Sequence, residues 1–96
     1  MSPEQIRWQR AEPSRFRFRF WPDEAAANAF DLRSGSTHCV SPLGLELIAL
    51  LDGGARTTAE LLDELHDVFE DREQACGFLH NELTRLSTIG LVAASS

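Results

Sequence analysis

The hydrophobic and polar positions of this chain change their period near residue 41. Before that point the pattern alternates, most clearly in Arg15–Phe20, where arginines and phenylalanines take turns. A period of two places alternate side chains on opposite faces of a strand. We expect the phenylalanines of this strand on a buried face, and Arg15, Arg17 and Arg19 on a solvated one.

Three further segments before residue 41 are expected to be extended. Ile6–Arg10 alternates briefly and predicts a strand or an extended arm. Ala26–Leu32 fits a strand, although its alanines would also suit a helix. Thr37–Val40 is β-favouring and follows a turn at Ser34–Ser36, in which Gly35 is free to take positive φ. The last two segments and Arg15–Phe20 together predict a three-stranded sheet.

After residue 41 the apolar positions recur at steps of three and four residues, which is typical of amphipathic helices. Ser41 suits an N-cap and Pro42 the first helical position, whereas Thr57 and Glu60 have the spacing of a capping box. Gly90 ends the last helix, and the apolar residues after it either pair briefly or pack as a tail. The helices are expected over Pro42–Leu51, from Thr57 or Thr58 to about Phe69, and from about Asp71 to Ile89.

These elements predict an α+β fold, with an N-terminal antiparallel three-stranded sheet followed by three helices. The order resembles a winged-helix-turn-helix arrangement. We expect a single domain over residues 1–96, with its core within about residues 6–92, because no linker or repeat interrupts the pattern. A membrane span is not expected, since Glu46 interrupts the apolar run Leu43–Leu51, and the first residues lack the organisation of a secretion signal.

The charge of the chain is unevenly distributed. The formal net charge is −6, and the chain contains no lysine. Residues 1–21 hold five arginines and two glutamates, a charge of +3, whereas the remainder holds four arginines against thirteen acids, a charge of −9. A helical part this acidic disfavours binding to the phosphate backbone of nucleic acids and leaves the arginine-rich strand as the exception.

The reactive side chains predict no catalytic or metal site. His38 and Cys39 are adjacent, but neighbours in a strand point to opposite faces and cannot share a proton directly. Cys76 and His80 share one face of a predicted helix, as two zinc ligands would. A site needs a third ligand, and no paired spacing brings in His38, Cys39 or His66. We therefore expect a protein that is not an enzyme and has no metal and no cofactor. The cysteine spacing favours reduced thiols in a cytoplasmic protein.

Short motifs over most of the chain resemble a known family. The motifs are Trp8, Phe20-Trp21, Ser34-Gly35-Ser36-Thr37-His38, Ser41-Pro42, Asp52-Gly53 and Leu86-Ser87-Thr88-Ile89-Gly90-Leu91-Val92. Together they resemble the PqqD-like peptide chaperones, which are recognition elements for ribosomally made, modified peptides. Within that family the chain is most similar to the branch encoded beside HPr-kinase-related proteins. Its Ser-Gly-Ser turn differs from the Pro-Glu-Gly type of the quinone-pathway members.

The resemblance implies a domain that binds a precursor or leader peptide and presents it to a modifying enzyme from the same gene cluster. In the family the leader adds as a strand beside the third strand of the sheet, in a groove against the third helix. Strand addition uses main-chain hydrogen bonds at an open edge and pockets for alternate side chains. The contacts implied here are Thr37, His38, Cys39, Val40, Phe78, Glu82 and Arg85.

Two other functions fit the same elements. A winged-helix protein that binds DNA would read bases from its third helix, where Arg72, Gln74, Asn81 and Arg85 stand among acidic residues. That mixture disfavours nucleic acid as a partner. The alternative is a structural or dimerising subunit of a partner enzyme, since an exposed strand edge would equally suit a second copy of this chain.

Overall fold

The structure, a computed structural model, describes residues 5–23, 25–65, 67 and 69–95. Its strands are β1 (Arg7–Arg10), β2 (Phe16–Phe20), β3 (Ala27–Asp31), β4 (Thr37–Val40), β5 (Arg56–Thr57) and β6 (Val92–Ser95). Its helices are α1 (Pro42–Asp52), α2 (Thr58–Glu64) and α3 (Arg72–Ile89), and a 3-10 turn, η2 (Pro13–Arg15), precedes β2. The described part of the chain is therefore α+β, as the sequence predicts.

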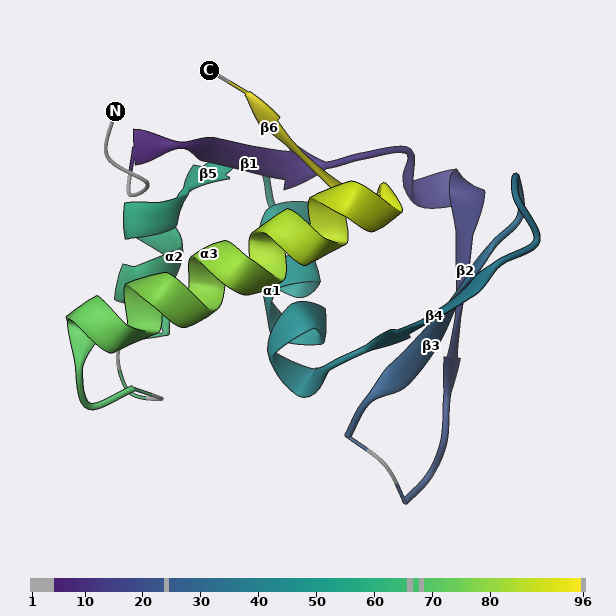
Figure 1. Cartoon of the computed structure of the whole chain (residues 1–96), viewed down its shortest axis with the longest axis horizontal. Coiled ribbons are helices and arrows are strands. Elements are labelled where there is room, and N and C mark those ends of the chain that lie inside the picture. Colours follow the sequence, from purple (N-terminus) through teal and green to yellow (C-terminus); the bar gives the residue numbers. More distant parts are fainter. Residues whose placement is uncertain (1–4, 24, 66, 68, 96) are drawn as a thin grey trace.

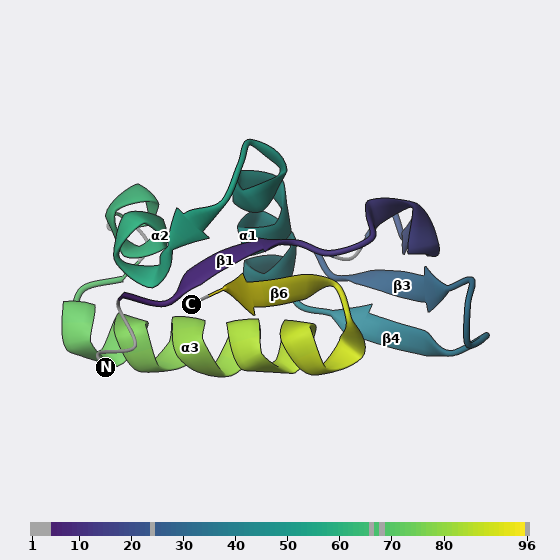
Figure 2. The ribbon, with the colours of Figure 1, turned by 90° about the horizontal axis from the view of Figure 1, so that it is seen from above.

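The strands form two separate antiparallel sheets (Figure 1). We call the sheet with the order β5-β1-β6 the body sheet, and the sheet with the order β2-β3-β4 the hairpin sheet. Figures 1 and 2 show the body sheet among the helices, whereas the hairpin sheet extends away from them to one side. The end of β4 leads directly into α1, which joins the hairpin sheet to the helical part.

The predicted order of one sheet followed by three helices is only partly confirmed. The hairpin sheet is the predicted one, and its three strands lie within the expected segments. The body sheet was not predicted as a sheet. Its middle strand is the expected N-terminal strand or arm, and it pairs with β5, between α1 and α2, and with β6, after α3.

The predicted helix starts are confirmed by their caps. The Ser41 hydroxyl accepts the Gly44 N–H at 3.0 Å, and Thr57 and Glu60 form a reciprocal capping box. Gly90 ends α3 at a φ of 104°, a left-handed conformation that suits glycine. The end of α2 was predicted wrongly, because the helix stops at Glu64 instead of Phe69. Leu65 leaves the helical conformation, and its side chain is buried in the core.

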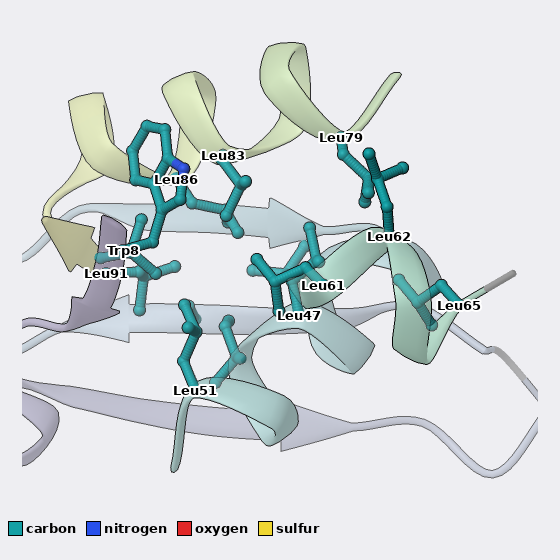
Figure 3. Packing of buried hydrophobic residues seen from close by; sticks show 14 of the residues in the cluster. Trp8, Leu47, Leu51, Leu61, Leu62, Leu65, Leu79, Leu83, Leu86 and Leu91 are labelled. Carbon is teal, nitrogen blue, oxygen red and sulfur yellow. The ribbon is translucent and has the colours of Figure 1, made fainter. Parts of the chain in front are cut away.

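The core lies between the body sheet and the helices. Figure 3 shows Trp8 of β1 close to Leu86 at the end of α3 and to Leu91 before β6. The Trp8 indole N–H donates a hydrogen bond of 2.9 Å to the buried Thr58 hydroxyl, which ties β1 to α2. The core side chains come from segments far apart in sequence, so their burial holds these segments together. The largest fully buried apolar side chains are Leu47, Leu61, Leu79, Leu83, Leu86, Leu91, Val40 and Val92.

The phenylalanine face of the hairpin sheet is covered only at one end. Phe16 is buried and Phe18 packs partly against the core, but Phe20 is 64% exposed. The expectation that all three are core residues is therefore wrong for Phe20. The reason is geometric: Phe18 and Phe20 line an open pocket against α1, instead of filling a closed space.

Arg15 also differs from its prediction. It lies in η2 and not in β2, and its guanidinium donates to both carboxylate oxygens of Asp31, at 2.9 and 2.7 Å. Asp31 is buried, and the Arg33 N–H and the Ser34 hydroxyl also donate to it. These donors, with Arg15 first, hold the pKa of Asp31 well below its usual range, and Asp31 in turn raises the pKa of Arg15. Arg15 is thus a structural residue at the turn.

Candidate functional site at the β4 edge

The β4 strand is an edge of the hairpin sheet, and its free side can be identified from the hydrogen bonds of the turn before it. The Asp31 N–H donates to the Ser36 carbonyl at 2.8 Å, and Ala27 pairs with Val40. Antiparallel pairs alternate between bonded and non-bonded positions. His38 and Val40 therefore turn their main-chain groups toward β3, whereas Thr37 and Cys39 turn theirs outward. In the described part of the chain no strand pairs with this outward side.

The side chains of β4 alternate as the sequence predicts. Thr37 and Cys39 are exposed and lie on the outer face of the hairpin sheet. His38 is half-buried and Val40 is fully buried, and both lie on the inner face with Ala27 and Ala29. Val40 is the only one of the four whose side chain has no exposed surface. It packs in the core, so we leave its side chain out of the candidate contact surface.

Two of the three predicted α3 residues reach β4 and the start of α1. The Arg85 guanidinium donates to the outward carbonyl of Cys39 and, at 3.3 Å, to the Glu82 carboxylate. The half-buried Glu82 also accepts a 3.0 Å hydrogen bond from the Ser41 hydroxyl. Arg85 therefore covers one main-chain acceptor of the β4 edge. Thr37, one of the two outward-facing residues, has no such contact with a described residue.

Gly44 allows the close approach of α3 to the end of β4. A Cβ atom at this position would lie 2.7 Å from a Glu82 carboxylate oxygen and 2.9 Å from a Val40 methyl carbon. Both distances are shorter than van der Waals contact allows. A larger residue at position 44 would therefore displace the side chains of Glu82 and Val40.

Phe78, the third predicted α3 residue, lies beyond the end of β4. Its ring is 52% exposed and stacks on Phe69, with 6.3 Å between the ring centres. It lines an open, almost wholly apolar pocket of about 390 Å³ at the start of α1. Sequence reasoning identified only Phe78 of this pocket. The other lining residues are Pro42, Leu43, Glu46, Leu65 and Phe69.

One signal for the missed residues was present in the sequence. Pro42 and Leu43 form the first turn of a helix that begins directly after an edge strand, so they had to lie beside that edge. Leu65 and Phe69 were predicted within α2, and their approach to Phe78 depends on the early end of that helix. No local pattern predicts this contact.

Charged groups border the site. Glu46 is exposed at the rim of the apolar pocket, and Glu82 and Arg85 neutralise each other beside β4. Among the described residues no three His, Cys, Asp or Glu side chains come together to hold a metal ion, and His66 lies outside them. Cys39 and Cys76 are free thiols. None of the described helices is both long and apolar enough to cross a membrane.

The geometry therefore offers an open strand edge, one guanidinium that covers part of it, and an apolar pocket at its end. Such a surface can take up an extended chain by main-chain pairing, with an apolar side chain as anchor. Comparison with protein-family models, with curated proteins and with solved structures finds no match to this chain.

Proposed function

We propose that this protein is a non-enzymatic peptide chaperone that binds a precursor or leader peptide as an added strand at the β4 edge. In this proposal it presents the peptide to a separate modifying enzyme and uses no metal or cofactor. One observation carries the proposal. The outward main-chain groups of Thr37 and Cys39 lead along β4 to the apolar pocket at Phe78. The motifs that resemble the PqqD-like chaperones support the same reading.

The proposed contacts divide into main-chain pairing and anchoring. Thr37 and Cys39 would bond the guest backbone, and their exposed side chains would flank it. The Arg85 guanidinium has to leave the Cys39 carbonyl before a guest N–H can bond it, and is then available to a guest carboxylate. A guest that continues past Ser41 reaches the pocket, where a large apolar side chain would pack on Phe78.

We also propose that the helical part is a winged helix-turn-helix. Its support is the element order α1-β5-α2-α3-β6, together with β1 placed between β5 and β6 in the body sheet. In this assignment the N-terminal strand supplies the middle strand of the wing. A cytoplasmic location belongs to the same proposal, and the two free thiols support it.

The direct test is a calorimetric titration of the full chain with the peptides that short reading frames beside its gene encode. The informative variant is Cys39→Pro, because its N–H points outward and proline removes it without breaking the pairing with β3. Cys39→Val is the matched control that keeps this N–H. We expect tight binding by the native protein and by Cys39→Val, and a loss of at least about tenfold in Cys39→Pro. Equal binding by two folded variants would refute strand addition at β4.

Val40→Pro is not a suitable variant. The Val40 N–H belongs to the pairing with Ala27, and its side chain is part of the core. A loss of binding in that variant would report a damaged sheet. Phe78→Ala is a better second variant, because its exposed ring contributes to the pocket with little effect on the core. We expect it to weaken the binding of peptides that carry a large apolar residue.

Binding to DNA is not favoured by any contact of α3. The guanidinium of Arg72 bonds Asp63, and that of Arg85 bonds Glu82 and the Cys39 carbonyl. Both cations on the exposed face of this helix are therefore engaged with groups of the protein. We expect no shift of duplex DNA in gels at low salt, where phosphate contacts are strongest.

A further inference from the structure

The hairpin sheet has a second open edge, on β2, which the proposed peptide site does not use. The Leu32 N–H donates to the Arg15 carbonyl at 2.8 Å, and Arg17 pairs with Phe30. By the alternation of antiparallel pairs, Phe18 and Phe20 turn their main-chain groups away from β3. In the part of the chain that the structure describes, no strand pairs with this side of β2. Two residues thus offer unpaired donors and acceptors.

An apolar pocket lies beside this edge. It has a volume of about 350 Å³ and opens between β2 and α1. Phe18 and Phe20 form one wall, with 6.3 Å between their ring centres, and Leu45, Ile48 and Ala49 of α1 form the other. The 64% exposure of Phe20 is unusual for a phenylalanine on the inner face of a sheet. A strand added to β2 would direct alternate side chains onto these rings.

The opposite face of β2 carries positive charge. Arg17 and Arg19 are exposed there, and Arg19 lies over the ring of Trp21 at 4.4 Å. Neither arginine has an ion-pair partner among the described residues, in contrast to Arg10, Arg15, Arg56 and Arg85. Residues 1–21, which include this strand, have a charge of +3 in a chain of −6. A partner at this edge therefore gains from acidic side chains on that face.

The arginines also select against a second copy of this chain. In an antiparallel pair of β2 strands centred on Phe18, Arg17 of one copy would lie opposite Arg19 of the other. Two such like-charged pairs oppose self-association at this edge. An acidic strand has the reverse effect, since its carboxylates would lie beside the arginines while its apolar side chains enter the pocket.

We propose that the β2 edge is a docking site for an extended segment of a partner protein in which acidic and apolar residues alternate. The apolar residues pack on Phe18 and Phe20, and the acidic residues pair with Arg17 and Arg19. The site is separate from the β4 edge, because β3 lies between the two strands. One domain can then hold a peptide at one edge and a protein partner at the other.

The test uses a short synthetic peptide of alternating glutamate and valine, with the full-length protein labelled with ¹⁵N. We expect amide shifts in Arg17–Trp21 at millimolar peptide, and none in Thr37–Val40. A lysine–valine peptide and a peptide with the same glutamates and valines in two blocks are the controls, and neither should produce these shifts. No shift in β2, or shifts confined to β4, would overturn the proposal.

Two sets of variants separate charge from main-chain pairing. In a variant with both Arg17→Glu and Arg19→Glu, binding of the glutamate–valine peptide should fall by at least about tenfold, and the lysine–valine peptide should bind instead. Phe20→Pro removes an outward N–H, and Phe20→Val keeps it, so the first should bind about tenfold more weakly than the second. If Phe20→Pro does not fold, the variant with Arg17→Glu and Arg19→Glu alone tests the proposal.

Other occupants would be recognised by different results. Binding of a short DNA duplex with the same arginine dependence, and with no effect of Phe20→Pro, would assign the arginines to phosphate and overturn the strand proposal. A dimer in sedimentation that Phe20→Pro dissociates would assign the edge to a second copy. Loss of binding at β4 in Cys39→Pro with unchanged shifts at β2 would support two independent sites.

Discussion

The two sheets of this molecule differ in how far apart their strands lie in the chain. The strands of the body sheet come from residues 7–10, 56–57 and 92–95, whereas those of the hairpin sheet lie within residues 16–40. One aromatic residue in each sheet shows how differently the two sheets are buried. Trp8 of the body sheet is 4% exposed, and Phe20 of the hairpin sheet is 64% exposed. The body sheet packs β1 and β6 against the helices, whereas the hairpin sheet has two edges with which no described strand pairs.

The largest effect is expected from Trp8→Ala. This change removes the buried side chain that packs near Leu86 and Leu91, and leaves the Thr58 hydroxyl without its indole partner. We expect a loss of about 3–5 kcal/mol in the free energy of unfolding. The matched change in the other sheet, Phe20→Ala, should cost less than about 1 kcal/mol, because most of that ring is already in water. Urea denaturation measures both, and similar costs would contradict the division between the sheets.

The second prediction concerns the acid sensitivity of the hairpin sheet. The Arg15 guanidinium holds the pKa of Asp31 below its ordinary value, so the Asp31 carboxylate stabilises the fold at neutral pH. A lowered pKa in the folded state means that this stability is present above about pH 5 and is lost as the pH falls. In Asp31→Asn we expect a lower Tm at pH 7, by less than in Trp8→Ala, because the Arg15 side chain is 22% exposed and its guanidinium can bond water instead.

The control for this prediction is the slope of Tm against pH. It should be shallower in Asp31→Asn than in the native protein, since one of the groups that bind protons on unfolding is gone. Some acid dependence should remain, because the main-chain N–H of Thr57 also lowers the pKa of Glu60 at the start of α2. An unchanged slope would show that Asp31 does not contribute to acid unfolding.

Gly44→Ala tests the contact between the hairpin sheet and α3. The new methyl group would come within 2.9 Å of Val40 and 2.7 Å of the Glu82 carboxylate. Glu82 can move at low cost, but the buried Val40 cannot, so we expect a loss of about 1–2 kcal/mol. Because alanine favours helix, the same substitution at the exposed Gly77 of α3, where a Cβ meets nothing within 4 Å, should stabilise the protein slightly. Thermal unfolding of the two variants gives opposite signs if the packing is as described.

The hairpin sheet could be predicted from the sequence because its determinants are local. The alternation in Arg15–Phe20, the turn at Gly35 and the Ser41-Pro42 helix start each act within a few residues. The open edge of β4 follows from these patterns. The pocket beside Phe78 does not, since Leu65 reaches it only because α2 ends at Glu64.

The body sheet could not be predicted because its pairings join distant segments. β5 has two residues and no strand pattern of its own, and it is extended because β1 pairs with it. Phe20 shows that a local pattern can also predict burial that the fold does not provide. Its place in a perfect alternation predicts burial, yet whether a side chain covers it depends on the position of α1. Periodicity identifies the face of a strand, and only tertiary packing decides how far that face is covered.

The smallest effect on stability is expected from Arg85→Ala. Arg85 is exposed and its ion pair with Glu82 is of the surface type, so the free energy of unfolding should change by less than about 0.5 kcal/mol. The change nevertheless uncovers the Cys39 carbonyl and leaves the outward side of β4 without a charged cap. An uncapped edge can pair with the same edge of a second copy.

We therefore expect Arg85→Ala to self-associate at concentrations where the native protein is monomeric, as measured by sedimentation velocity. Addition of Cys39→Pro should reverse this, because the outward N–H is then absent. Self-association that survives the proline would place the contact elsewhere, and an unchanged monomer would show that the shape of β4, and not Arg85, protects this edge.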